Sequence, residues 1–406
     1  MRRKTALVMG LAVLAGFTSA QESLGVRLMG RCSAATDAHG VVVVGDYAYV
    51  ADGYGGLRVI SVADRAHPVE VGRCDTPGYA EDVALNGDYA CVADFDQGLR
   101  VISVADPAHP VEIGYYDTPA TAFGVAVNGY HVYVADFNGG LRIISVADPT
   151  NPIEVGHYDT QPYARGVALS GDYVYVANSF DGLRVISVAD PTNPTEVSHF
   201  QTPDDAWGVA IVSEYAYVSA SDAGLRVVSV ADPANPVEVG YCDTPGSATA
   251  VALGGDSAYV ADWGCGLRVI SVAAPTDPVE VGYYVVPLYQ ARDVTVSGDH
   301  IYLAVSAGGL QIFESYVPGV GEGRQHTAGS SPPTPAFARG VLHLPASSVG
   351  HETSSVLLDI SGRKVLGLKA GANDVRALAS GVYFVRIEPS AASREPLATT
   401  KVVVAR

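Results

Sequence analysis

Lysine is absent from the long middle of this chain. Residues 21–336 hold 13 Arg and no Lys against 38 Asp and Glu, a net charge of −25, while the whole chain of 406 residues carries −18. Binding to a phosphate backbone requires clustered basic side chains. We therefore expect no nucleic-acid partner. Hydrophobic residues nevertheless make up 48% of the chain, enough for a folded core.

Long apolar runs are also scarce. One run of 12 residues, from Ala6 to Phe17, follows the basic Arg2-Arg3-Lys4 and precedes the small residues up to Ala20. A run of this length is too short to span a bilayer as a helix, and the pattern is that of a secretory signal peptide over 1–20. An N-terminal membrane anchor is the alternative. No other segment has 18 uncharged apolar residues, so we expect a protein that is not integral to the membrane.

The last quarter of the chain has a different composition. Residues 317–336 are rich in Gly, Pro, Ser and Thr without apolar periodicity, which is typical of a flexible linker. Beyond it, over 337–406, short β-rich runs predict a small C-terminal β-sandwich with a net charge of +4. The region between the two ends, 21–316, is predicted to form one repetitive domain.

Internal repetition dominates the middle of the chain. The triplet Gly-Leu-Arg returns every 42 residues, and a seventh copy, Gly309-Leu310-Gln311, comes one residue late. One unit reads as four short strands, at Gly166–Ser170, Tyr173–Ala177, Leu183–Val188 and Glu196–Phe200. Four strands in about 42 residues is typical of a β-propeller blade.

The strand count indicates how the ring closes. The seventh unit lacks a fourth strand, while Val26–Cys32 matches a fourth strand that has no blade of its own. We therefore predict an all-β, seven-bladed propeller whose N-terminal strand completes the last blade, which removes exposed sheet edges.

Units such as Leu183–Val188 followed by Ala-Asp-Pro-Thr-Asn-Pro resemble the LVIVD-repeat proteins, over residues 26–315. This resemblance implies a surface β-propeller. The tail, through Leu358–Val365, Leu378–Arg386 and Lys401–Val404, resembles the C-terminal sorting domains of type IX (Por) secretion, related to FlgD-like immunoglobulin folds. It implies an export machinery as partner, and a protein that is secreted or attached to the outer surface of a Gram-negative-type bacterium.

Residues that recur in every unit are expected to be architectural. An Arg on strand three and a Glu on strand four predict a cross-strand pair in each blade, a ring of ligand-binding Arg being the alternative. The Asp that ends strand two predicts an Asx-type cap on the following loop rather than a metal ring. Cys32, Cys74 and Cys242 replace repeated aromatics and are interpreted as core residues, while a Cys74–Cys91 disulfide stays open.

Residues that vary between units point to the functional face. Two sets of loops share one face: those from strand four to the next strand one, and those from strand two to strand three. The first set has one aligned position nearest the axis, with Tyr79, Tyr163, Asp205 and Tyr289 beside it. That position holds His39, Glu81, Phe123, Arg165, Trp207, Thr249 and Arg292. The second set carries Tyr54, Phe95, Phe137, Phe180 and Trp263.

An aromatic face with a few charges is typical of a recognition surface, although aromatic rings also close loops by packing. We expect a non-enzymatic, monomeric binding or scaffold module for a cell-surface protein or glycan, with no cofactor and no metal. The alternative is a hydrolase or lyase with an acid–base cluster at the mouth, drawn from His39, Glu81, Arg165, Asp205 and Arg292. No GxSxG, HExxH or phosphate-loop motif supports it.

Overall fold

The computed structural model describes residues 23–315, apart from residue 162, and seven further strands between 336 and 405, these by their backbone alone. The signal peptide predicted for 1–20 and nearly all of the linker predicted for 317–336 lie outside the described residues. Among the residues described, one three-residue 3-10 helix, η1 (Ser306–Gly308), accompanies an otherwise all-β fold. No helix there is long and apolar enough to cross a membrane.

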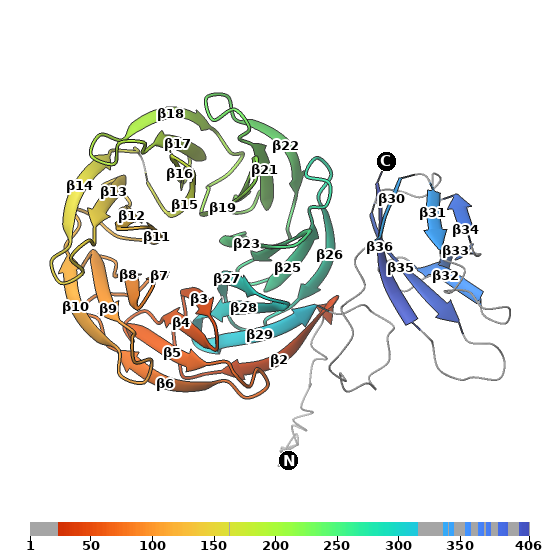
Figure 1. Cartoon of the computed structure of the whole chain (residues 1–406), viewed down its shortest axis with the longest axis horizontal. Helices are drawn as coiled ribbons and strands as arrows, with labels where there is room; N and C mark the ends of the chain where they lie inside the picture. Colours follow the sequence, from red (N-terminus) through yellow and green to blue (C-terminus); the bar gives the residue numbers. More distant parts are fainter. Residues whose placement is uncertain are drawn as a thin grey trace, which may run out of the picture.

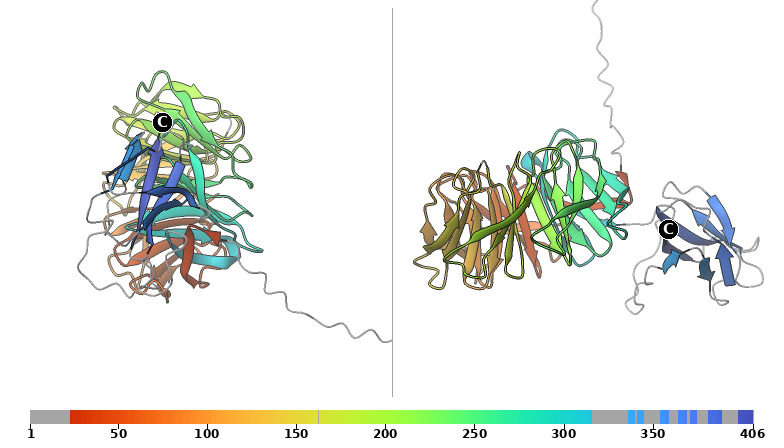
Figure 2. Two further views of the ribbon diagram at one scale, coloured as in Figure 1. Left: turned by 90° about the vertical axis from the view of Figure 1, so that its right-hand side faces the viewer. Right: turned by 90° about the horizontal axis from the view of Figure 1, so that it is seen from above.

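Seven antiparallel sheets form a ring (Figure 1), six with four strands and one with a short fifth strand, so the predicted seven-bladed propeller is confirmed. One blade consists of β15 (Gly166–Ser170), β16 (Tyr173–Ala177), β17 (Leu183–Ser187) and β18 (Thr195–Phe200), paired in that order. The first strand of each blade lies nearest the axis, and the side views show a flat disc (Figure 2).

The other complete blades have the same order. They are β3 (Gly40–Val44), β4 (Tyr47–Ala51), β5 (Leu57–Ser61) and β6 (Val69–Cys74); β7 (Asp82–Asn86), β8 (Tyr89–Ala93), β9 (Leu99–Ser103) and β10 (Val111–Tyr116); β11 (Gly124–Asn128), β12 (His131–Ala135), β13 (Leu141–Ser145) and β14 (Ile153–Tyr158); β19 (Gly208–Val212), β20 (Tyr215–Ser219), β21 (Leu225–Ser229) and β22 (Val237–Cys242); β23 (Ala250–Gly254), β24 (Ser257–Ala261), β25 (Leu267–Ser271) and β26 (Val279–Tyr284).

The glycine of the repeated triplet is needed for its turn. Gly182 has φ +76°, and a Cβ there would lie 2.3 Å from the carbonyl oxygen of Phe200. A left-handed backbone with no space for a side chain accepts only glycine. The triplet therefore fixes where strand three begins in each blade.

The last blade is closed by the N-terminal strand, as the strand count predicted. Strand β2 (Val26–Cys32) pairs with β29 (Gly309–Ser315), beside β28 (His300–Val305) and β27 (Ala291–Ser297). The short β1 (Ser23–Leu24) adds a contact that the sequence did not reveal, because it pairs with β26 of the preceding blade. The N-terminus thus joins the two neighbouring blades at the closure.

The core lies between the blades rather than at the axis. Each apolar cluster combines residues of two neighbouring sheets, as where Leu57 and Val59 of one blade pack against Val92 and Ile102 of the next. Strands that alternate between two such interfaces bury both faces, which explains their nearly continuous Val, Ile and Leu content. The axis is left free for polar residues.

The C-terminal part forms two sheets, described by their backbone. Five strands are ordered β30 (Ala336–Arg339), β36 (Ala398–Ala405), β35 (Gly381–Glu388), β32 (Ser354–Leu358) and β33 (Lys364–Leu368). A second sheet pairs β31 (Val341–Leu344) with β34 (Gly371–Asp374). The packing of these sheets as a sandwich stays a prediction.

Candidate functional site

The two predicted sets of loops meet on one face of the ring. The residue at the aligned variable position of each blade is its mouth residue. In six of the seven blades, the loop after the second strand forms an isolated bridge with the residue that precedes the next blade's mouth residue, as between Phe137 and Ala164. The Phe137 N–H donates to the Ala164 carbonyl at 3.1 Å, and the Ala164 N–H donates back at 3.0 Å. The aromatic side chain of one blade is thereby held beside the mouth residue of the next blade.

Three of these bridging residues are aromatic and have a left-handed backbone. The φ angles are +50° at Phe95, +42° at Phe137 and +43° at Trp263, where the first blade has Gly53 at +49°. A non-glycine residue in this region costs about 1–3 kcal/mol and persists only where its surroundings enforce it. The bridges supply that enforcement, and the result is a rim of fixed aromatic rings.

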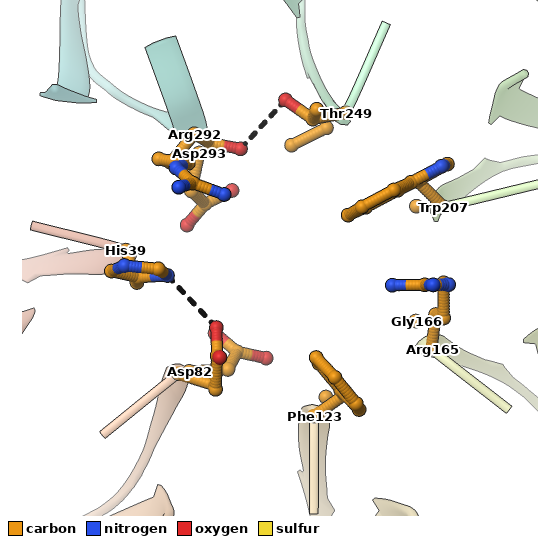
Figure 3. Close-up of a pocket in the computed structure, with 14 residues that line it drawn as sticks. His39, Asp82, Phe123, Arg165, Gly166, Trp207, Thr249, Arg292 and Asp293 are labelled. Atoms are coloured by element: carbon orange, nitrogen blue, oxygen red, sulfur yellow. Dashed lines mark hydrogen bonds and ion pairs between the residues drawn. The ribbon is translucent and has the colours of Figure 1, made fainter. Parts of the chain in front are cut away.

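The mouth itself is a pocket of about 230 Å³ at the axis (Figure 3). All seven blades contribute one side chain each to its lining: His39, Glu81, Phe123, Arg165, Trp207, Thr249 and Arg292. These are the seven residues at the aligned variable position. The repeat alignment thus placed them together correctly, while their role as ligand contacts stays a prediction.

One wall of the pocket is acidic. His39 is 7% exposed, and its Nδ1 lies 2.8 Å from a carboxylate oxygen of Glu81. Its Nε2 lies 2.8 Å from the hydroxyl of Tyr79, which donates to Asp37. Burial raises the pKa of Tyr79, and Asp37 adds to the effect. Four side chains from two neighbouring blades therefore form one hydrogen-bonded chain that ends at the pocket.

Two further carboxyl groups, Asp82 and Asp293, line the pocket and were missed by the sequence analysis. Asp82 accepts the Val125 N–H at 2.9 Å, and Asp293 accepts the Val41 N–H at 2.8 Å. Burial raises the pKa of Asp82 to about 8, with a further rise from Asp293, and burial raises the pKa of Asp293 to about 6.

A signal for these two carboxyl groups existed in the repeat alignment. They occupy the position directly after the mouth residue. The other five blades have only glycine or alanine there: Gly40, Gly124, Gly166, Gly208 and Ala250. Two Asp in a column of small residues mark a departure from the repeat as clear as those at the mouth position.

The facing wall is cationic and aromatic. The Arg165 guanidinium carbon lies 4.0 Å from the centroid of Trp207 and 5.3 Å from that of Phe123. Arg292 lies on the other side of the pocket, beside Asp293 and next to His39 (Figure 3), and its guanidinium carbon is 4.1 Å from the centroid of Trp263. Burial lowers the pKa of Arg165, offset in part by Asp205 and Glu81. Such cation–π contacts orient the guanidinium groups but do not neutralise them.

The remaining candidates surround the pocket. Tyr163 stacks on Phe137 with centroids 4.2 Å apart, while Tyr54 and Phe180 are 83% and 61% exposed. Phe95 packs edge-on against Phe123. Asp205 and Tyr289 do not line the pocket, and burial raises the pKa of Asp205.

Thr249 lines the pocket, but its hydroxyl is engaged by the backbone. The hydroxyl lies within donating distance of the carbonyl oxygens of Ala261 in its own blade and of Ala291 and Arg292 in the last blade, that of Arg292 being nearest at 2.9 Å. Its part in the site is therefore structural.

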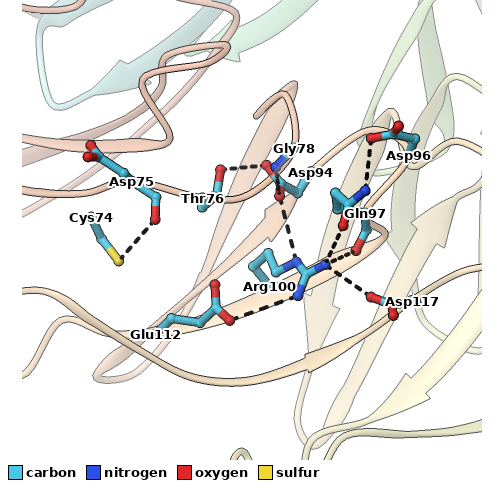
Figure 4. Close-up of polar contacts among 10 residues, drawn as sticks. All are labelled: Cys74, Asp75, Thr76, Gly78, Asp94, Asp96, Gln97, Arg100, Glu112 and Asp117. Atoms are coloured by element: carbon cyan, nitrogen blue, oxygen red, sulfur yellow. Dashed lines mark hydrogen bonds and ion pairs between the residues drawn. The ribbon is translucent and has the colours of Figure 1, made fainter.

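The repeated charged residues form ion pairs and hydrogen bonds within the blades (Figure 4). Arg100 reaches Glu112 at 3.9 Å, and the predicted Arg–Glu pair is present in all six blades that carry the triplet, at 2.5–4.0 Å. Arg100 also lies 3.6 Å from Asp94, which accepts the Thr76 hydroxyl at 2.5 Å and the Gly78 N–H at 2.8 Å.

The expected Asx cap on the following loop is therefore wrong. The side chain of Asp94 holds the loop that enters its own blade, because the antiparallel sheet brings that loop beside the end of strand two. Among the described residues, no group of three or more His, Cys, Asp or Glu is arranged as metal ligands.

All five cysteines are free, so the Cys74–Cys91 disulfide is not formed. Cys32 and Cys91 are buried, and Cys74 and Cys242 pack against apolar clusters, in agreement with their interpretation as core residues.

The LVIVD repeat family model matches seven segments of the chain: 35–76, 77–118, 120–160, 162–202, 203–244, 245–286 and 290–313. The chain belongs to the LVIVD repeat family. In this LVIVD protein each of the first six repeats supplies the mouth residue and the four strands of one blade. The seventh supplies the mouth residue and three strands, and β2 completes its blade. No curated protein matches the chain.

Solved structures share the fold of this LVIVD protein. The computationally designed Ika8 protein is 8% identical with a TM-score of 0.53, over 71% of this chain and 98% of its own. The RRP9 WD40 repeats are 13% identical with a TM-score of 0.58, over 73% and 98%. A catalytically inactive virginiamycin B lyase variant from Staphylococcus aureus is 11% identical with a TM-score of 0.57, over 73% and 100%. At these identities the likeness concerns the fold alone.

Proposed function

We propose that this propeller is a non-enzymatic binding or scaffold module that recognises a cell-surface protein or glycan through its central mouth. One observation carries the proposal: the seven variable side chains, one per blade, converge on a single pocket. The repeated residues are engaged in ion pairs within each blade.

The rim supports recognition rather than simple loop closure. The same left-handed bridging position holds Gly53, Ser179 and Ser221 in other blades, so the turn itself does not require an aromatic residue. Phe95, Phe137 and Trp263 surround the pocket, and fixed aromatic anchors beside a charged group are common in hot spots of binding.

The test replaces Phe137, Trp207 and Trp263 by Ala together in the full chain. We expect binding to a glycan panel and to immobilised surface proteins to be lost while the urea midpoint stays close to that of the control variant. The control, Tyr115→Ala with Tyr241→Ala, removes exposed rings from the outer strands β10 and β22. A triple variant that unfolds while the control stays folded would show that the rings only pack.

A hydrolase or lyase at the mouth is the second candidate. The observation in its favour is the hydrogen-bonded chain from Asp37 through Tyr79 and His39 to Glu81, beside Asp82, whose raised pKa makes it a proton donor near neutral pH. A substrate screen with Glu81→Gln and His39→Asn decides: turnover in the parent chain that both variants lose would establish the enzyme.

We also propose that the protein is exported and is either released or held at the outer surface of a Gram-negative-type bacterium. The basic and apolar start of the chain and the sorting-like tail support this. Fractionation of cells that express the full chain or a chain ending at residue 336 tests it. Equal export of both chains would show that the tail is not needed for export. Size-exclusion chromatography of the full chain tests the expected monomeric state.

A further inference from the structure

The two arginines of the mouth differ from the repeated ones. Each Arg of the triplet has a carboxylate within 4.0 Å. Arg165 and Arg292 have no hydrogen bond or ion pair to any residue that the structure describes. Their Nε atoms are buried without a partner, but so are those of five triplet arginines, so the missing carboxylate is what distinguishes the two mouth arginines. In a propeller with a large excess of acids, two unpaired guanidinium groups that face one pocket are an unusual feature.

We propose that the mouth binds a sugar ring that carries one carboxylate, held by Arg165 against Trp207 and Phe123, an inference that rests on the proposed function and names its ligand class. A half-buried guanidinium has lost part of its hydration without gaining an ion pair. A ligand carboxylate compensates for the lost hydration, because the planar guanidinium group of Arg binds a carboxylate through two parallel hydrogen bonds.

The aromatic residues determine where the ring lies. Trp207 and Arg165 project side by side into the pocket, with Phe123 next to them (Figure 3). Their flat apolar surfaces suit the C–H face of a sugar ring. At about 230 Å³ the cavity is smaller than the usual range of about 300–1,000 Å³ for drug-sized ligands, so it has room for one ring unit.

The acidic wall restricts the charge of the ligand. Glu81, Asp82 and Asp293 face the same space and can accept hydrogen bonds from hydroxyl groups. Asp82 is protonated near neutral pH and adds no charge, but the ionised carboxylates of this wall repel a second negative charge. A sugar with several hydroxyl groups and a single carboxylate satisfies both walls, whereas an acidic peptide brings charge without the hydroxyl groups.

The test uses the chain's own fluorescence. Its two Trp, Trp207 and Trp263, lie with ring centroids 6.5 Å apart at the mouth, so their emission reports on this site. We would titrate the full chain with galacturonate, a single sugar ring with one carboxylate, and with neutral galactose. We expect a saturable change with the acidic sugar and at least tenfold weaker binding of the neutral one.

Arg165→Gln should weaken galacturonate binding about 10- to 100-fold, and Arg165→Lys should restore part of it. The matched control is Arg73→Gln, an exposed arginine of β6 without a carboxylate partner, which should bind as the parent does. Urea unfolding of each variant establishes that it is folded, and the Lys variant provides the comparison if the Gln variant is not.

Equal affinity for both sugars, or unchanged affinity in folded Arg165→Gln, would overturn the carboxylate assignment while leaving a glycan-binding mouth intact. Failure to bind either sugar overturns the sugar proposal, and a Glu-rich peptide then tests whether Arg165 serves a protein ligand. If that peptide binds and Arg165→Gln abolishes its binding, the ligand class is peptide. The proposed function has its own test: it fails if the triple alanine variant at Phe137, Trp207 and Trp263 binds the glycan and protein panel as the parent chain does.

Discussion

The buried carboxyl group of Asp82 should make the propeller less stable as the pH rises. Its pKa is about 8 in the folded chain, against 3.8 for the ordinary group. The folded state therefore holds a proton that the unfolded chain releases above pH 4. The free energy of unfolding contains a contribution that is complete below pH 4 and is lost as the pH rises through about 8.

The size of this effect follows from the two pKa values. Ionisation of the unfolded chain at pH 7 favours unfolding by about 4 kcal/mol for a group with these values. Asp82 lines the pocket and titrates together with Asp293, so water in the pocket and the coupling reduce the contribution of this one group. We expect Asp82→Asn to stabilise the chain by about 2 kcal/mol at pH 7 and by close to zero at pH 4.

Urea unfolding followed by the fluorescence of Trp207 and Trp263 measures this from pH 4 to pH 9. The asparagine keeps an acceptor for the Val125 N–H, so the change is mainly one of charge. Asp172→Asn, in the exposed turn between β15 and β16, is the control and should leave the pH dependence unchanged. If Asp82→Asn and the parent lose the same stability between pH 4 and pH 8, the assignment of the raised pKa is refuted.

Two further predictions concern the repeated framework. Arg100→Met should lower the free energy of unfolding by about 3 kcal/mol, because it leaves the buried Asp94 carboxylate without its cation, while Arg73→Met should change it little; equal urea midpoints would contradict the ion-pair role. Gly182→Ala should cost more than about 2 kcal/mol, because its Cβ would meet the Phe200 carbonyl, whereas Gly171→Ala, with φ +57° and open space, should cost about 1 kcal/mol. Thermal unfolding of both glycine variants checks the difference, and similar midpoints would rule out the clash.

Much of the fold could be read from the repeat. The 42-residue spacing predicted the blades, and the unpaired Val26–Cys32 segment predicted the closure, because a missing strand at one end must be supplied by the other. The short pairing of β1 with β26 could not be foreseen, since two residues carry no periodic pattern. The role of Asp94 was also mistaken, because its partners Thr76 and Gly78 precede it by a whole hairpin.

The sequence by itself determined which residues vary from blade to blade. When the blades close into a ring, residues at the same repeat position lie at the same distance from the axis. That is why the repeat alone was enough to group His39, Arg165 and Trp207. Only the tertiary structure decided which of them touch and which charges are left unpaired. Hydrogen bonds, desolvation and cation–π contacts depend on distances of a few ångströms across different blades, and no spacing along a chain encodes those distances.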